Sequence, residues 1–169
     1  VLRALGQEGG RLKIVPFIIG NSIKKVLRLI ESAENAGSDG MVLTPPNYYP
    51  SISNEMLYRF ILRAISESRL PFLLYHKDNP FKIPITSNLI RKLSENKRFM
   101  GVIDNGSDVN YISSIKKEFS DLVVLSGAEK QHRDWLKSGA DGIVSWLGNV
   151  YPSLTCELVS FVDSGDDQA

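Results

Sequence analysis

Apolar positions along the chain fall into two alternating kinds of segment. Short apolar runs without a polar residue at every second position are typical of strands buried on both faces of a parallel sheet. Longer segments with an apolar residue at every third or fourth position are typical of amphipathic helices. The predicted strands are Ile14–Ile19, Asp39–Thr44, Pro71–Tyr75, Phe99–Ile103, Leu122–Leu125 and Ile143–Ser145.

An amphipathic helix is predicted after each of these strands. Side chains that accept hydrogen bonds at a helix N-cap precede most of the helical stripes, and a proline, which the first turn tolerates, precedes the last. The predicted helix starts are Asn21 or Ser22, Ser53, Thr86, Asp108, Glu129 and Pro152. Six strand–helix units in strict alternation predict an α/β protein with a parallel sheet.

Two helix-to-strand joints repeat one short pattern. Residues Ala36–Gly40 precede one predicted strand and residues Ser138–Gly142 precede another, and each segment contains a glycine followed two positions later by an aspartate. We interpret each glycine as a helix C-cap and the residues after it as a tight turn into the strand. The repeated joint supports a repeated strand–helix unit.

The pattern leaves two architectures open. A (β/α)8 barrel usually needs about 250 residues, and this chain has 169. The six units therefore predict either an open doubly wound sheet or a barrel that lacks two units. We expect one domain over residues 1–169, with residues 163–169 as a frayed polar tail.

The composition of the chain restricts the classes of molecule that it is expected to bind. The net charge of +1 gives no basic field for nucleic acid, and no apolar run reaches the length of a membrane span. The single Cys156 fits a reducing compartment, so we expect a cytoplasmic protein. Two histidines and one cysteine are scattered without metal-ligand spacing, and no phosphate-binding glycine motif is present, so neither a metal nor a cofactor is expected.

The stretch Phe99–Asp108 has the strongest functional pattern. An apolar run is followed by Asp104, Asn105, Gly106 and Ser107, and a helix then begins. The polar loop lies at the carboxyl end of a predicted strand, where parallel α/β proteins bind their ligands. We expect Asp104 to hold this loop by capping, in preference to a catalytic role.

These residues and four other segments resemble the dihydrodipicolinate synthase and N-acetylneuraminate lyase family. The stretch around Ile103 is similar to its Gly-Val-Lys-Asp-x-x-Gly-Asp motif. The other segments, in the same order as in the family, are Thr44–Pro50, Leu73–His76, Leu125–Gly127 and Gly139–Pro152. The resemblance favours the barrel, with about six units that correspond to the family's third to eighth strands. We therefore expect either a fragment or a gene product that lacks the N-terminal quarter.

The resemblance also implies site residues. In this family a lysine forms a Schiff base with pyruvate, and Ile103 stands at its position. Tyr75 matches the tyrosine that relays protons beside the Schiff base, although a tyrosine that packs at the barrel mouth is the simpler alternative. Tyr48 and Tyr49 match a Tyr-Tyr pair that completes the relay, and packing of that loop on its own turn or at an interface is an equal alternative. Gly127 and Ser145 match substrate-binding positions.

Two functions from different classes follow from this resemblance. The first is a carbon–carbon lyase of the class I aldolase type, a homo-oligomer that handles pyruvate or another 2-keto acid, with lost or altered Schiff-base catalysis. The second is a non-catalytic homologue that serves as a structural or ligand-binding subunit. Lys77 and His132 are expected to be solvated charges, and Lys77 is the alternative nucleophile nearest to a strand end.

Overall fold

The computed structural model describes residues 12–46, 52–77, 85–106 and 108–165. Six strands in these residues pair in chain order, β1 to β6, and the registered pairs β1–β2, β2–β3 and β5–β6 are parallel. The strands are β1 (Phe17–Ile18), β2 (Met41–Leu43), β3 (Phe72–Lys77), β4 (Phe99–Asn105), β5 (Val123–Ser126) and β6 (Gly142–Ile143). The chain divides into two compact units between Gly101 and Val102, within β4.

The first unit alternates strands with three helices. These are α2 (Ile23–Asn35), α3 (Asn54–Ile65) and α4 (Ser87–Ser94). Each begins at a hydroxyl side chain that accepts a hydrogen bond from the backbone three residues on, and the three N-caps are Ser22, Ser53 and Thr86. The expected starts are therefore confirmed, and Ser22 is the cap of α2 where Asn21 was an alternative.

The described core of this unit is mostly apolar. Phe72 of β3 and Leu57 of α3 are fully buried, and Val26 and Ile30 of α2 are 1% and 3% exposed. Phe72 also packs against Phe99, with ring centroids 5.3 Å apart. Complete burial of such side chains contributes about 1.5–3 kcal/mol each, so this packing explains why the amphipathic pattern was informative.

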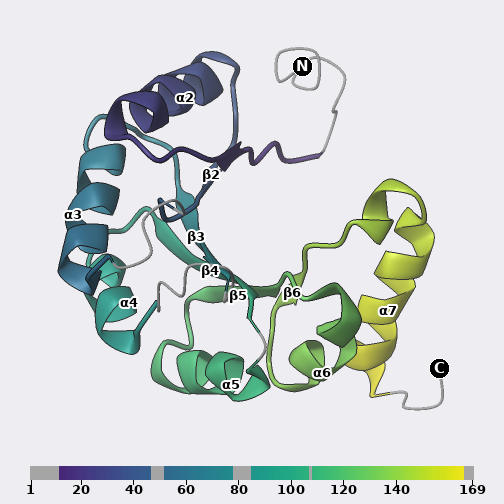
Figure 1. The fold of residues 1–169 in the computed structure, drawn as a ribbon. Helices are drawn as coiled ribbons and strands as arrows, with labels where there is room; N and C mark the ends of the chain where they lie inside the picture. The colour runs from purple at the N-terminus through teal and green to yellow at the C-terminus, as the bar shows by residue number, and fades with distance from the viewer. Residues whose placement is uncertain (1–11, 47–51, 78–84, 107, 166–169) are drawn as a thin grey trace. The chain divides into compact units, whose positions relative to one another are not determined.

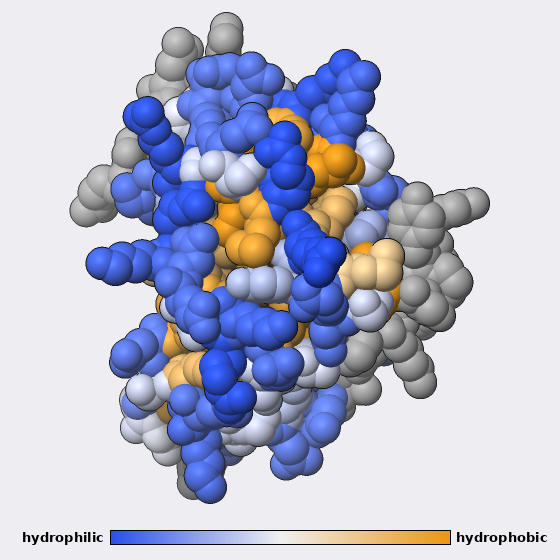
Figure 2. Space-filling view, turned by 90° about the vertical axis from the view of Figure 1, so that its left-hand side faces the viewer, coloured by the Kyte–Doolittle hydropathy of each residue, from blue (hydrophilic) through white to orange (hydrophobic). Residues whose placement is uncertain are grey.

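The helices of the first unit lie on one side of its strands (Figure 1). Helix α2 contacts α3 and α3 contacts α4, as helices do when they follow one another around the outside of a barrel. In a doubly wound sheet, helices cover both faces instead. Figure 2 looks onto this helical side, where hydrophilic side chains cover most of the surface and hydrophobic ones gather in a smaller area.

The second unit contains three helices and two 3-10 turns. The helices are α5 (Val109–Glu118), α6 (His132–Lys137) and α7 (Pro152–Ser164), and the turns are η1 (Glu129–Gln131) and η2 (Leu147–Asn149). Asp108 is the N-cap of α5, as expected, and its carboxylate accepts a hydrogen bond from Asn110 N at 3.0 Å. Trp135 of α6 is fully buried and is the largest side chain of this core.

The two repeated joints have the same geometry. The C-caps are Ala36 and Ser138, one residue earlier than expected, and the glycines that follow them, Gly37 and Gly139, adopt φ angles of 76° and 101°, which explains the choice of glycine at both positions. Asp39 then accepts hydrogen bonds from Ile14 N and Lys13 Nζ. Asp141 accepts the corresponding bonds from Val124 N at 2.8 Å and Lys116 Nζ at 2.9 Å. The Asp141 carboxylate thus attaches its joint to β5, and the Asp39 carboxylate attaches its joint to the segment that leads into β1.

Several element boundaries differ from the expected ones. Strand β1 covers only Phe17–Ile18, because Pro16 has no N–H for a ladder and Ile14 bonds to the Asp39 side chain. The first residues of the expected frayed tail belong to α7, which continues to Ser164 and ends at Gly165, whose φ is 73°, and residues 166–169 lie outside the described part of the chain. None of the helices in the described ranges combines the length and the apolar run that a membrane span requires.

Candidate functional site

The carboxyl end of β4 in the second unit is polar directly after a buried apolar residue. Ile103 is 2% exposed and Asp104 is 1% exposed. Asp104 Oδ1 accepts a hydrogen bond from Gly106 N at 3.0 Å, and the Asp104 carbonyl accepts one from Gly127 N at 2.7 Å. The expected capping role of Asp104 is confirmed, because its carboxylate closes the turn that follows the strand.

Gly127 lies where the backbone after β5 approaches the end of β4. A Cβ atom at this position would be 3.2 Å from Asn105 Cβ and 3.4 Å from both the Asp104 carbonyl oxygen and Ile103 Cγ2. These distances are short for a carbon atom, so a larger residue would push the two strand ends apart. The close approach is a packing reason for glycine here, beside the substrate-binding role that the resemblance implies.

Ser126 and His132 form a buried polar pair at the end of β5. Ser126 is fully buried, His132 is 4% exposed, and Ser126 Oγ lies 2.8 Å from His132 Nδ1. The expectation that His132 is a solvated side chain is wrong. The helix that carries it is short, and its first turn faces the core, so a polar residue pattern misled the prediction.

Glu129 connects this pair to the loop after β6. Its Oε1 accepts a hydrogen bond from Ser145 Oγ at 2.5 Å, and its Oε2 accepts one from Trp146 N at 3.0 Å. Leu147 N donates to Oε1 at 3.4 Å, and His132 Nε2 lies 3.6 Å from Oε2. One carboxylate therefore gathers several donors from two segments that are distant in sequence.

The surroundings of Glu129 and His132 determine their protonation states. Burial alone would raise the pKa of Glu129, yet the hydrogen bonds from Ser145, Trp146 and Leu147, with the nearby His132, together lower it below its ordinary value. Burial lowers the pKa of His132, and the Glu129 carboxylate only partly offsets that shift. At neutral pH the pair is consequently a carboxylate that faces a neutral imidazole.

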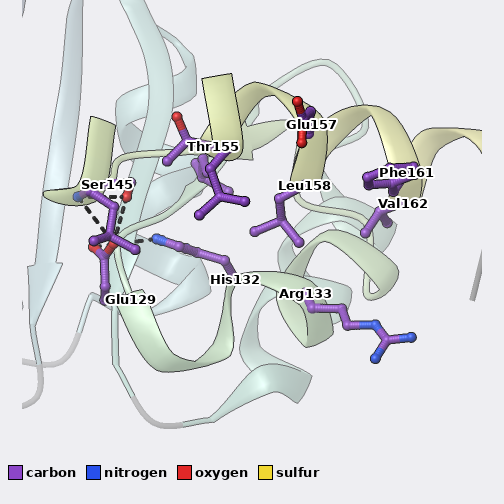
Figure 3. Close-up of a pocket in the computed structure, with 12 residues that line it drawn as sticks. Glu129, His132, Arg133, Ser145, Thr155, Glu157, Leu158, Phe161 and Val162 are labelled. Atoms are coloured by element: carbon purple, nitrogen blue, oxygen red, sulfur yellow. Dashed lines mark hydrogen bonds and ion pairs between the residues drawn. The ribbon is translucent and has the colours of Figure 1, made fainter. Parts of the chain in front are cut away.

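A cavity of about 260 Å³ opens beside this cluster. In Figure 3 the imidazole of His132 points toward Glu129, while Thr155 and Leu158 of α7 face them across the cavity. The lining is mostly apolar, and its remaining residues are Arg133, Ile143, Ser145, Leu147, Leu154, Glu157, Phe161 and Val162. The polar atoms of Glu129, His132 and Ser145 thus lie at one wall of an apolar hollow.

For the predicted tyrosines of the site, the structure gives only part of the arrangement. Tyr75 lies on β3 in the first unit, where its ring meets Phe17 edge-on with centroids 5.4 Å apart. Its position relative to Ile103 stays a prediction, and Tyr48 and Tyr49 lie outside the described residues. Within the described part of the chain, no group of three or more histidine, cysteine, aspartate or glutamate residues could hold a metal ion.

The sequence contained one usable signal for the residues that it missed. Glu129 and His132 are three positions apart, which brings side chains together on one helical turn. They also follow directly after the Leu125–Gly127 segment. The partner segment, Ser145–Leu147, could not be paired with them by spacing alone, because only the fold brings it near.

Comparison with known proteins agrees with this architecture. Residues 3–169 match the model of the Dihydrodipicolinate synthetase family. The 4-hydroxy-tetrahydrodipicolinate synthase of Thermodesulfovibrio yellowstonii is 27% identical over 91% of this chain and 54% of its own length. The synthase of Archaeoglobus fulgidus is 28% identical over 96% of this chain and 56% of its own length. The chain thus spans about half the length of the curated relatives that it matches.

Solved structures show the same fold. The 4-hydroxy-tetrahydrodipicolinate synthase of Methylacidiphilum fumariolicum SolV is 28% identical, with a TM-score of 0.89 over 97% of this chain and 55% of that one. The sialic acid aldolase of Ruminococcus gnavus is 20% identical, with a TM-score of 0.86 over 92% and 52%, which shows the fold alone. The predicted α/β fold of incomplete (β/α)8-barrel type is confirmed. The matched residues and the shared fold together place the chain in the Dihydrodipicolinate synthetase family.

Proposed function

We propose that this chain descends from a carbon–carbon lyase acting on pyruvate or another 2-keto acid and that it has lost Schiff-base catalysis. The observation that carries the proposal is Ile103. Its side chain is 2% exposed on β4, at the position where the family resemblance expects the lysine. A hydrocarbon side chain has no nitrogen to attack a carbonyl carbon.

The step that Ile103 cannot perform is the formation of the Schiff base. In a class I aldolase the lysine amine attacks the keto carbon, water leaves, and the iminium accepts the electron pair of the bond that breaks. Lys77, the alternative nucleophile, is exposed at the end of β3. It therefore lacks the desolvated surroundings that activate amine nucleophiles.

What the site retains is the capacity for non-covalent binding. Gly127, Ser145 and Glu129 lie at or after the carboxyl ends of β5 and β6, where ligands of parallel α/β proteins bind. We expect a small 2-keto acid such as pyruvate as the ligand, without a cofactor. Tyr75, Tyr48 and Tyr49 remain the proposed proton-relay positions of the ancestral site.

Borohydride trapping with pyruvate tests this proposal directly. The chain and its Ile103→Lys variant are each treated with pyruvate and borohydride, which reduces any imine to a stable secondary amine, and both are measured by mass spectrometry. We expect no adduct on the parent chain and at most weak trapping on the variant. A pyruvate adduct on the parent, at Lys77 or another lysine, would show that Schiff-base chemistry survives.

A structural subunit is the alternative function, and one observation favours it. Helix α7 has no buried residue, and apolar side chains are exposed along η2 and α7, among them Trp146 at 81%, Tyr151 at 59% and Leu154 at 56%. Exposed apolar clusters of this kind mark interaction surfaces. Sedimentation of the chain should then show a homo-oligomer, and a monodisperse monomer with a cooperative melt would count against this alternative.

A further inference from the structure

Glu129 and His132 form a pair that the proposed Schiff-base chemistry does not involve. Glu129 belongs to η1 and His132 begins α6, directly after β5. The pair contacts Ser126 on one side and the loop residues Ser145 and Trp146 on the other. It therefore joins the carboxyl end of β5 to the loop after β6.

The hydrogen-bond donors in this chain of contacts can be assigned by charge. Glu129 is a carboxylate and can only accept, so the imidazole nitrogen that faces it, Nε2, carries the ring proton. The 3.6 Å between Nε2 and Oε2 is longer than a hydrogen bond, so this contact is electrostatic, and Nε2 is buried without a hydrogen-bond partner among the described residues. In a neutral imidazole Nδ1 is then the acceptor, and Ser126 Oγ–H donates to it at 2.8 Å. Ser126 thus donates to His132, the Nε2 proton of His132 faces Glu129, and Ser145 donates to Glu129 from the opposite side.

Glu129 provides the side-chain attachment of this loop, and Val144 N, directly before the loop, donates to the Ser126 carbonyl of β5 at 2.7 Å. The hydrogen bonds from Asn149 N to the Trp146 carbonyl, and from Val150 N and Tyr151 N to the Leu147 carbonyl, run within the segment and shape its turn. They do not connect it to another element. The bonds from Ser145 Oγ, Trp146 N and Leu147 N to one carboxylate provide that connection, and bonds to a charged acceptor are stronger than neutral ones.

We propose that Glu129 and His132 are positioning residues that fix the loop Ser145–Leu147 against the carboxyl end of β5. The proposal rests on the proposed function in one respect, since Gly127 and Ser145 are the positions expected to contact the 2-keto acid. Glu129 holds the loop through three donors, and His132 holds Glu129 in the orientation that receives them. Two other charged residues line the cavity beside His132: Arg133 from α6 and Glu157 from α7.

A packing role for His132 is the competing explanation. Its ring is almost completely buried, and an apolar side chain of similar size would fill the same volume. The two explanations differ in what they require at Nε2. Positioning requires a donor that faces Glu129, and packing requires only the volume.

Amide hydrogen exchange of the full chain, measured by NMR without ligand, separates these explanations. Glu129→Gln should raise the exchange rate of Trp146 by about tenfold, the scale of one lost hydrogen bond to a charged group. The rate of Leu147 should rise less, because Leu147 N also donates to Ser145 Oγ at 3.1 Å. His132→Leu should raise them by about threefold, whereas His132→Gln, whose side-chain amide can donate near the place of Nε2, should stay close to the parent. Glu157→Gln is the matched control, because Glu157 is exposed, lines the same cavity and should change neither amide.

The amides of β5 and α5 report whether the effect is local. If their exchange rises as much as that of the loop in Glu129→Gln, the role is general stability and the proposal is wrong. Unchanged loop exchange in Glu129→Gln, or in His132→Leu, would also overturn it. The ¹⁵N shifts of the His132 ring should show the proton on Nε2, and a proton on Nδ1 would contradict the assigned order.

A pyruvate titration keeps this inference separate from the proposed function. If the parent chain does not bind pyruvate, the proposed ligand is wrong, while the exchange data still decide the role of Glu129 and His132. If the parent binds pyruvate, we expect the affinity to fall several-fold in Glu129→Gln and to be retained in Asp163→Asn, a change at an exposed residue of α7 outside the cavity lining. Equal affinity in the parent and Glu129→Gln would overturn the positioning of the ligand-binding loop.

Discussion

The two units of this chain share one kind of helix-to-strand joint but differ in the residues that they bury. Both contain the aspartate-fastened joint, at Asp39 in the first unit and at Asp141 in the second. The first unit buries apolar side chains on each of its helices. The second buries Asp104, Ser126 and His132 near its strand ends and leaves its last helix without a buried residue. The first unit buries the hydroxyl residues Ser38 and Ser68, whereas an ionisable carboxyl group and an imidazole are buried in the second. Burial of polar groups costs free energy unless hydrogen bonds compensate.

The largest expected difference between the units is in how much their helices contribute to the free energy of unfolding. Ile30→Ala on α2 removes a side chain that is 3% exposed, and we expect a loss of about 2–5 kcal/mol in the free energy of unfolding. Leu154→Ala on α7 changes a side chain that is 56% exposed, and we expect a change within about 0.5 kcal/mol. Denaturant unfolding measures both. A comparable loss in the two variants would show that another chain or another copy covers α7.

The two fastened joints should differ by a smaller amount. Asp141→Asn weakens hydrogen bonds from Val124 N and from Lys116 Nζ, whose side chain is 22% exposed, and we expect a loss of about 1–3 kcal/mol. In the joint at Asp39 the partner Lys13 is 77% exposed, so solvent screens the ion pair and Asp39→Asn should cost less. Thermal melts of both variants check the order. A larger loss at Asp39 would mean that the backbone bond to Ile14 dominates.

The smallest expected effect is the pH dependence of the second unit. Burial lowers the pKa of His132 in the folded chain below its ordinary value of 6.5, so between those two values the unfolded chain binds a proton that the folded chain does not. Stability is then complete above pH 6.5 and falls as the pH decreases toward the folded-state pKa, by at most about 1.4 kcal/mol per pH unit.

Urea unfolding at several pH values between neutral and mildly acidic measures this slope. His132→Gln should flatten it. The lowered pKa of Glu129 acts in a separate window, below its ordinary value of 4.5. A slope that is the same in His132→Gln and the parent would show that His132 does not titrate as its burial implies.

Local sequence rules determined much of this protein. The hydroxyl and carboxylate caps at Ser22, Ser53, Thr86 and Asp108 begin their helices because each cap needs only the backbone two or three residues ahead. The glycines at the two joints end their helices for an equally local reason, a left-handed φ. Apolar periodicity placed the strands and helices because burial on one face imposes it. The segment around Ile103 supplied the family and, with it, the barrel.

The tertiary structure alone decided the rest. The strand–helix pattern does not say on which side of the sheet each helix lies, so without the family resemblance it left both a barrel and an open sheet open, and the contacts between successive helices show the arrangement directly. The burial of His132 depends on how α6 packs on β5, which a polar helical pattern does not reveal. Glu129 and Ser145 lie 16 positions apart, and their hydrogen bond exists because two parallel strands end side by side. Contacts of that range follow from strand pairing, and a sequence read residue by residue does not contain them.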